Sequence, residues 1–322
     1  MIRRIVTTLA LILFSMLASA SGPRKLIFDT DWWTDVDDAC AIRILLDADR
    51  RGDIELLGIC LSAVNATSAK SLDSFLRHEG CTDIPLGADK QATDYNGKPC
   101  YHQLIIDSCK DDRARDLVGC EDCVDFYRRL LAESKGKVDI VAVGYPNALA
   151  RLLESGPDEH SRLSGEQLVR RKAGNLYMMA GNYPSGKENN FCRTERSRKA
   201  GATVCSQWPG KITFLGFETG IKVVAGGRLD ADDLLHEVLV SHKSGNGRYA
   251  WDPMTTLIAI TGNPVSEGYV PVRGTNKVNA ADGSNTFIPS KRGKHSYVVM
   301  DREARWYADR IDALLARPCT IK

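Results

Sequence analysis

Short apolar runs alternate with amphipathic segments along most of this chain. The apolar runs predict buried strands at 25–28, 54–61, 84–87, 138–143, 176–180, 212–215 and 296–300. The segments with apolar side chains at helical spacing predict helices at 39–49, 66–79, 124–134, 146–154, 230–241, 252–261 and 302–316. Strands that alternate with helices indicate an α/β fold of Rossmann-like architecture, with a mainly parallel central sheet and helices on both faces.

One stretch interrupts this alternation. Residues 88–120 are polar, carry Gly, Pro and Cys and show no clear period, so we expect a long loop of the kind that often forms a functional lid. No internal repeat or low-complexity linker divides the chain. We therefore expect residues 21–322 to form a single domain.

The N-terminus has the pattern of a secretory signal peptide over residues 1–20. Arg3 and Arg4 supply the positive region, residues 5–17 the apolar region, and Ala18-Ser19-Ala20 a small-residue cleavage site. The apolar region is shorter than the roughly 20 residues that a membrane span needs. An uncleaved anchor is the alternative. We expect a secreted or extracytoplasmic protein without stable membrane association after cleavage.

The amino-acid composition limits the classes of molecule that this protein is expected to bind. The 322 residues include 43 Lys and Arg against 41 Asp and Glu, a formal net charge of +2, which indicates no polybasic surface for nucleic acid. We expect a small-molecule substrate, and a homo-oligomer is compatible with the pattern. The chain has ten cysteines. In an exported protein we expect disulfides within the polar regions 100–123 and 192–205, with Cys40 and Cys60 as buried thiols.

An acidic loop follows the first predicted strand. The segment 29–38 holds five carboxylates in ten residues, together with Trp32 and Trp33. Like charges this close raise one another's pKa unless a cation offsets them, and calcium binds six to eight oxygen ligands. In parallel sheets the ligand site lies beyond the carboxyl ends of the strands, where this loop begins. The alternative is a solvated acidic turn, which the paired tryptophans argue against.

This loop resembles the opening signature of inosine–uridine-type nucleoside hydrolases. That signature is DTD-Pro-Gly-x-DD-Ala, and here Asp29-Thr30-Asp31 is followed by Asp37-Asp38-Ala39. The spacer Trp32-Trp33-Thr34-Asp35-Val36 departs from the family pattern because it is two residues longer and contains the Trp-Trp pair.

Later segments resemble further motifs of the same family, in the same order. They are the strand that leads to Asn65, the strand end at Val143, the segment from Gly181-Asn182 to Glu188-Asn189-Asn190, and Trp251-Asp252-Pro253. The resemblance covers residues 26 to about 260 and implies a nucleoside-hydrolase-like fold. It also implies calcium-dependent hydrolysis of the N-glycosidic bond of ribonucleosides, which yields free base and ribose.

The resemblance assigns roles to these residues. Calcium would be bound by Asp31, Asp38, Asp252 and the backbone carbonyl of Val143, and water bound to it is more acidic than bulk water. Asp31 would accept the proton of the attacking water. Asp37 would face the sugar hydroxyls or that water.

The ribose ligands implied by the resemblance are Asn65, Asn182, Glu188 and Asn190. The transition state of glycoside cleavage resembles an oxocarbenium ion, so Glu188 would stabilise its positive charge.

Activation of the leaving base is a separate question. Part of the family has a histidine where this chain has Trp251, and the purine-preferring branch has tryptophan. Purine preference is therefore implied, with the base stacked between Trp251 and either Trp32 or Trp33. Core packing of Trp251 is the alternative. His102, in the long loop, is a second candidate acid, although a solvated loop histidine is the simpler interpretation.

Two other functions stay open. Phe28-Asp29-Thr30-Asp31 also fits the opening of a haloacid-dehalogenase-type phosphatase, with Asp29 as nucleophile and magnesium as metal. A non-catalytic ribose- or nucleoside-binding protein on the hydrolase scaffold is the other alternative.

Overall fold

The computed structural model describes residues 22–316, and the predicted signal peptide lies outside them. Its centre is an eleven-stranded sheet with the order β4-β3-β2-β1-β5-β6-β8-β13-β11-β12-β7, and β9 and β10 form a separate ribbon. The strands are β1 (Arg24–Thr30), β2 (Ile54–Leu61), β3 (Leu86–Ala88), β4 (Glu121–Asp122), β5 (Val138–Ala142), β6 (Ala173–Met179), β7 (Ser185–Gly186), β8 (Ile212–Leu215), β9 (Val224–Ala225), β10 (Arg248–Tyr249), β11 (Tyr269–Val278), β12 (Asn285–Pro289) and β13 (His295–Met300).

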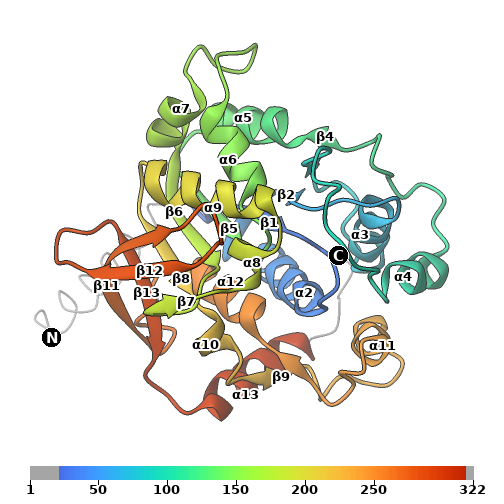
Figure 1. Ribbon diagram of the computed structural model, residues 1–322. Coiled ribbons are helices and arrows are strands. Elements are labelled where there is room, and N and C mark those ends of the chain that lie inside the picture. The colour runs from blue at the N-terminus through green and yellow to red at the C-terminus, as the bar shows by residue number, and fades with distance from the viewer. Residues whose placement is uncertain (1–21, 317–322) are drawn as a thin grey trace, which may run out of the picture.

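The run from β4 to β13 is parallel throughout, so the predicted α/β class with a mainly parallel sheet is confirmed. Helices flank this sheet on both faces (Figure 1). They are α2 (Asp37–Arg50), α3 (Ser68–His78), α4 (His102–Cys109), α5 (Cys123–Glu133), α6 (Asn147–Glu154), α7 (Gly165–Lys172), α8 (Asn189–Cys192), α9 (Glu195–Gln207), α10 (Phe217–Gly220), α11 (Leu234–Ser241), α12 (Trp251–Thr261) and α13 (Ala304–Leu315).

Alternate side chains of the central strands enter two separate cores. On β1, Leu26 and Phe28 join the core beneath α2, α3 and α12, whereas Ile27 joins the core beneath α5, α6, α7 and α9. All three side chains are fully buried. Burying a side chain of this size stabilises the fold by roughly 2 kcal/mol, which is why a strand covered on both faces is a continuous apolar run.

The antiparallel end of the sheet was not predicted. Strands β11 and β12 form a hairpin, β11 also pairs with β13, and β12 pairs with the short β7 (Figure 1, left). Here buried and exposed positions are mixed along β11, with Val270 half exposed. A strand with one solvated face lacks the apolar run that marks the buried strands.

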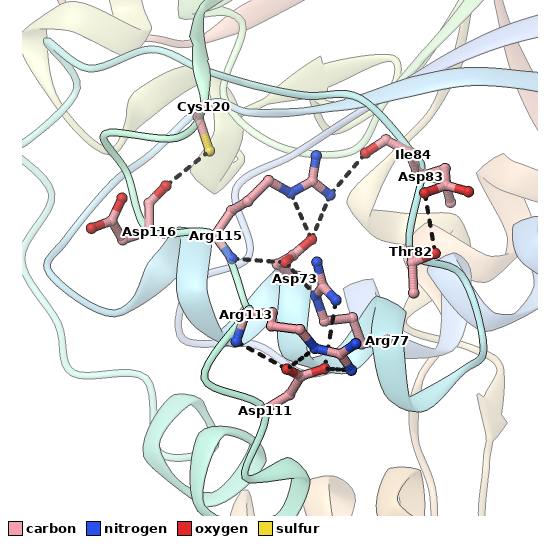
Figure 2. Close-up of polar contacts among 10 residues, drawn as sticks. All are labelled: Asp73, Arg77, Thr82, Asp83, Ile84, Asp111, Arg113, Arg115, Asp116 and Cys120. Atoms are coloured by element: carbon pink, nitrogen blue, oxygen red, sulfur yellow. Dashed lines mark hydrogen bonds and ion pairs between the residues drawn. The ribbon is translucent and has the colours of Figure 1, made fainter.

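Residues 89–120 form more than the expected loop, because they include α4, which packs against α3. The end of this excursion is fastened to α3 by Asp73, a fully buried carboxylate (Figure 2). Its Oδ2 accepts hydrogen bonds from Arg77 Nε and the Arg115 backbone N–H, both at 2.8 Å, and its Oδ1 accepts one from Arg115 Nε at 2.9 Å. Arg115 also donates to the carbonyl of Ile84 at 2.9 Å. The excursion is therefore held in place by ion pairs.

The nine cysteines between residues 22 and 316 are all free thiols, so the disulfides expected within 100–123 and 192–205 are not formed there. Cys40 and Cys60 are buried thiols, as expected. No helix in this part of the chain has the length and apolarity needed to cross a membrane.

Candidate active site

A cavity of about 240 Å³ lies beyond the carboxyl ends of β1, β5, β6 and β8. Strands of a parallel sheet end at the same edge, so the loops that follow them converge there. Its lining residues are Asp31, Asp35, Asp37, Asp38, Val143, Met179, Glu188, Asn189, Asn190, Phe217, Arg248, Trp251 and Asp252. Six of these side chains are carboxylic acids, and one is a cation.

Three carboxylates come together at one end of the cavity. Asp37, Asp38 and Asp252 are buried, and each offers an oxygen such that the three oxygens lie within 4.8 Å of one another. Asp37 and Asp38 begin α2, and Asp252 lies in the first turn of α12, which packs against α2. The positive ends of two helix dipoles thus face the cluster and favour its negative charge. The backbone N–H of Asp252 also donates to Asp37 Oδ2 at 3.0 Å, which links the two helix ends.

Burial and mutual repulsion perturb these acids. Burial raises the pKa of Asp31 well above its usual range, and the charge of Asp38 raises it further. The pKa values of Asp37 and Asp252 are raised in the same way, by burial and then by neighbouring carboxylates. Burial raises the pKa of Asp38 to about 6, against hydrogen bonds from Thr30 and from the backbone of Trp32. A site that gathers so many buried acids favours a positively charged ligand.

The donor set fits a hard divalent cation. Asp31, Asp37, Asp38 and Asp252 offer carboxylate oxygens, the ligands that calcium prefers. The guanidinium of Arg248 is paired with Asp35, and its charge offsets only a small part of the shift at Asp37, where burial and neighbouring carboxylates dominate.

The implied metal ligands and the observed cluster overlap without being the same set. Asp38 and Asp252 belong to it, and Asp31 and Val143 line the same cavity. Asp37, expected to face the sugar hydroxyls or the attacking water, also belongs to this cluster. The carbonyl of Val143 accepts a hydrogen bond from Asn190 Nδ2 at 2.8 Å.

Glu188 and Asn190 form the wall next to the acidic cluster. The side chain of Glu188 caps α8 and is held by the backbone N–H groups of Gly181 (2.9 Å) and Asn190 (2.8 Å). Burial raises its pKa to about 7. Asn190 Nδ2 also donates to the carbonyl of Met179 at 2.8 Å, so its amide orientation is set by two strand ends.

Two of the implied ribose ligands lie outside the cavity lining. Asn65 Oδ1 accepts from the Thr67 backbone N–H at 2.8 Å and from two hydroxyl groups at 3.0 Å, so it serves the turn before α3. The backbone of Asn182 is bonded to the side chain of Asn285. The sequence could not reveal these structural roles, because an asparagine side chain stabilises turns as readily as it binds ligands.

The expected sandwich of tryptophans does not form. Trp32 is fully buried, packs against Phe75 and Tyr101, and donates from Nε1 to Ser71 Oγ at 2.9 Å. Trp33 is buried in a separate small cluster with Tyr95. The backbone of Trp32 is left-handed, with φ of 43°, and this turns its ring away from the cavity and into the core.

The aromatic wall of the cavity is built from other rings. Trp251 lines it but is only 8% exposed, whereas Phe217 is 37% exposed. Their ring centroids lie 5.5 Å apart in a stacked arrangement, and Trp251 Nε1 donates to the Phe217 carbonyl at 2.9 Å. Trp251 thus supports Phe217, which offers the larger free aromatic surface.

His102 does not line the cavity, and neither does His242. His102 is buried rather than solvated, and its ring nitrogens contact Trp32 O at 2.9 Å and Thr67 Oγ1 at 3.0 Å. His242 follows α11 and bonds Ser244 Oγ at 3.0 Å.

Asp29, the nucleophile of the phosphatase alternative, is fully buried and absent from the cavity lining. Its Oδ2 accepts a hydrogen bond from Tyr127 at 2.7 Å. An acid enclosed in this way is not accessible to a phosphate ester.

A larger cavity, of about 840 Å³, lies at the amino ends of the strands and is lined by residues such as Arg24, Lys137 and Lys211. Several of these cations already have partners: Arg24 pairs with Asp139, and Lys137 donates to two backbone carbonyls. The acidic cavity is the candidate site, because it contains the clustered acids and the aromatic wall.

Arg248 and Phe217 are functional candidates that the sequence did not reveal. Arg248 binds Asp35, a residue of the longer spacer, across 213 positions of sequence. The sequence shows only that a basic residue precedes Trp251-Asp252, and this does not indicate which acid it pairs with.

Solved structures share this fold at low sequence identity. An inosine–uridine-preferring nucleoside hydrolase from Bacillus anthracis matches with a TM-score of 0.64 and 14% identity, over 91% of this chain and 99% of its own. The type III effector protein XopQ, solved in complex with adenosine diphosphate ribose, matches with a TM-score of 0.64 and 14% identity over 92% of each chain. The effector protein XOO4466 matches with a TM-score of 0.64 and 14% identity over 96% of this chain and 97% of its own.

No protein-family model and no curated protein matches this chain by sequence. The structural matches show a nucleoside-hydrolase-like α/β fold.

Proposed function

We propose that this protein hydrolyses the N-glycosidic bond of ribonucleosides in a calcium-dependent reaction, releasing free base and ribose. One observation carries the proposal: a buried cluster of Asp37, Asp38 and Asp252 adjoins Glu188 and Asn190 in a single cavity with an aromatic wall. The fold shared with the Bacillus anthracis hydrolase supports the same conclusion.

Calcium would be bound by carboxylates of Asp31, Asp38 and Asp252, with Asp37 and the carbonyl of Val143 at the same end of the cavity. When bound, the ion supplies positive charge that acidifies water and orients the ribose hydroxyls.

The chain's own groups then divide the reaction between them. Asp31 accepts the proton of the attacking water, because a carboxylate is the available base at this end of the cavity. The new bond joins the water oxygen to C1′, and the electron pair of the C1′–N bond leaves with the base. Glu188, fixed by two backbone N–H groups, stabilises the positive charge that develops on the ribose.

The base lies against the aromatic wall. Phe217 presents the exposed ring, and Trp251 holds it in place through stacking and the hydrogen bond to its carbonyl. Purines offer a larger stacking area than pyrimidines, so we propose a preference for purine nucleosides. We further propose that the protein is exported and acts outside the cytoplasm, on the basis of the N-terminal pattern at residues 1–20.

The direct test is a panel of purine and pyrimidine ribonucleosides, assayed by release of reducing sugar with added calcium and with chelator. We expect turnover of purine nucleosides that chelation removes and calcium restores. Turnover that survives complete chelation would contradict calcium dependence, and the absence of turnover on every nucleoside would contradict hydrolysis.

A non-catalytic ligand-binding function is the second candidate. The observation that favours it is the shared fold of XopQ, whose structure contains bound adenosine diphosphate ribose. Calorimetry and the reducing-sugar assay together separate the two functions. A pure binder takes up ribose-containing ligands without releasing sugar, whereas the hydrolase releases sugar from them.

A further inference from the structure

Arg248 is the single cationic side chain among the residues that line the acidic cavity. It lies on the short strand β10, just before α12, and its side chain is 23% exposed. Its guanidinium forms a two-point ion pair with Asp35, in which Nε donates to Oδ1 at 2.7 Å and Nη2 donates to Oδ2 at 2.5 Å. This pairing fixes the plane of the guanidinium.

Aromatic rings hold the same guanidinium from another side. The carbon Cζ of Arg248 lies 5.2 Å from the ring centroid of Tyr249 and 5.4 Å from that of Trp251. These cation–π contacts hold the guanidinium near Trp251, which stacks with Phe217, and Arg248 also lies close enough to Asp37 to lower the pKa of that carboxyl. Asp35 engages Nε and Nη2 and leaves Nη1 outside the ion pair, so the Nη1 edge of the guanidinium can donate to a ligand in the cavity that Arg248 lines.

Cleavage of an N-glycosidic bond leaves an electron pair on the base, and the charge must be stabilised. A histidine cannot do this here, because His102 and His242 lie outside the cavity lining and Trp251 stands before Asp252. Arginine stays protonated at all working pH values, so it stabilises an anion by hydrogen bonding rather than by giving up a proton.

We propose that Arg248 binds the departing base and stabilises its developing negative charge, with Asp35 as the residue that positions it. This inference rests on the proposed hydrolase function. As the C1′–N9 bond breaks, its electron pair passes to the purine ring and reaches the acceptor atoms that Arg248 contacts. The base then takes a proton from solvent, while the proton of the attacking water passes to Asp31.

The N–H donors of the Arg248 guanidinium discriminate among purine bases. A guanidinium pairs well with the O6 and N7 acceptors of hypoxanthine or guanine, whereas adenine presents an amino donor in place of O6. The site is therefore suited to 6-oxopurine ribonucleosides, and inosine and adenosine form the matched pair of substrates that tests this. Each well-formed contact of this type discriminates between bases by roughly 10- to 100-fold.

The experiment compares the wild-type protein with Arg248→Met, Arg248→Lys and Asp35→Asn, each with added calcium. Substrates are inosine, adenosine and p-nitrophenyl β-D-riboside, whose leaving group departs without stabilisation. We expect Arg248→Met to lower kcat/KM for inosine by roughly 100-fold and to lower that for adenosine by less than about 10-fold. We expect turnover of p-nitrophenyl riboside to change by less than about 3-fold.

Two further variants separate a binding role from a structural one. Arg248→Lys keeps the charge without the two-point geometry, so it should recover part of the inosine activity. Asp35→Asn should lower kcat for inosine more than it raises KM, because the guanidinium is no longer held where charge develops on the base. Calorimetry with hypoxanthine and adenine provides a readout without turnover: wild-type protein should bind hypoxanthine more tightly, and Arg248→Met should bind both alike. Circular dichroism melting verifies that each variant is folded.

The outcomes distinguish this inference from the proposed function. If wild-type protein hydrolyses all three substrates and Arg248→Met loses the same factor on each, the leaving-group role is overturned and hydrolysis stands. If wild-type protein hydrolyses none of them, both are overturned. Equal binding of hypoxanthine and adenine by the wild-type protein overturns the 6-oxopurine selectivity.

Discussion

Protonation of His102 should weaken the fold as the pH falls below neutrality. The side chain is 1% exposed, and burial lowers its pKa from 6.5 to about 4, against the opposing effect of its hydrogen bond to Trp32 O. A carbonyl oxygen can only accept, so Nε2 carries the proton of the neutral ring. The contact ties the start of α4 to the acidic loop.

The sign and size of this change in stability follow from the linkage between protonation and folding. Between pH 6.5 and 4 the unfolded chain binds a proton on His102 that the folded chain does not, so stability falls as the pH is lowered through this window. Since each pKa unit is worth about 1.36 kcal/mol, the full effect is about 3 kcal/mol below pH 4, and roughly 2 kcal/mol of it is expressed at pH 5.

The assay is urea unfolding of wild-type protein and His102→Gln at pH 8 and pH 5, with chelator present so that metal binding does not contribute. Glutamine keeps an N–H for Trp32 O but does not titrate in this range. The carboxylates of the cavity titrate in both proteins and cancel in the comparison. We expect wild-type protein to lose about 2 kcal/mol more than the variant between the two pH values. Equal losses, within about 0.5 kcal/mol, would refute the argument.

Three further predictions concern the cavity and the excursion. Asp38→Ala and Asp252→Ala should each abolish calcium binding by calorimetry and nucleoside turnover, whereas the exposed Asp112→Asn should leave both unchanged; retained activity in either alanine variant would count against the site. Phe217→Ala should raise KM for inosine by roughly 10-fold, because a stacked base is worth about 1–3 kcal/mol, and an unchanged KM would exclude stacking on this ring. Asp73→Asn should destabilise the protein by about 3 kcal/mol in urea unfolding and expose the excursion to limited proteolysis, since it leaves two arginines without their buried partner; wild-type resistance would show that the clamp contributes little.

The parallel half of the fold was predictable because its strands are buried on both faces. Strands such as β2 and β8 have the residue ranges that their apolar runs predict, at 54–61 and 212–215. The hairpin of β11 and β12 was missed, because mixed burial leaves no such run. The helix α4 was missed because it is short and only two of its residues are buried.

The site was predictable only where several acids follow a strand. The family resemblance placed Asp38 and Asp252 among the metal ligands, and both lie in the observed cluster, whereas it assigned Asp37 to the sugar hydroxyls or the attacking water. The direction of the Trp32 ring could not, because it depends on a left-handed backbone that is rare for tryptophan. The pairing of Arg248 with Asp35 is likewise a property of the folded chain, since no local pattern joins positions so far apart.

The late position of several site residues constrains how the protein matures. Asp252 is needed to complete the carboxylate cluster, and the segment that carries Glu188 is held through β7 by β12, at residues 285–289. A nascent chain that ends before these residues therefore lacks a finished ion-binding pocket. During synthesis, the acids of residues 31–38 must stay hydrated or protonated until most of the polypeptide has left the ribosome.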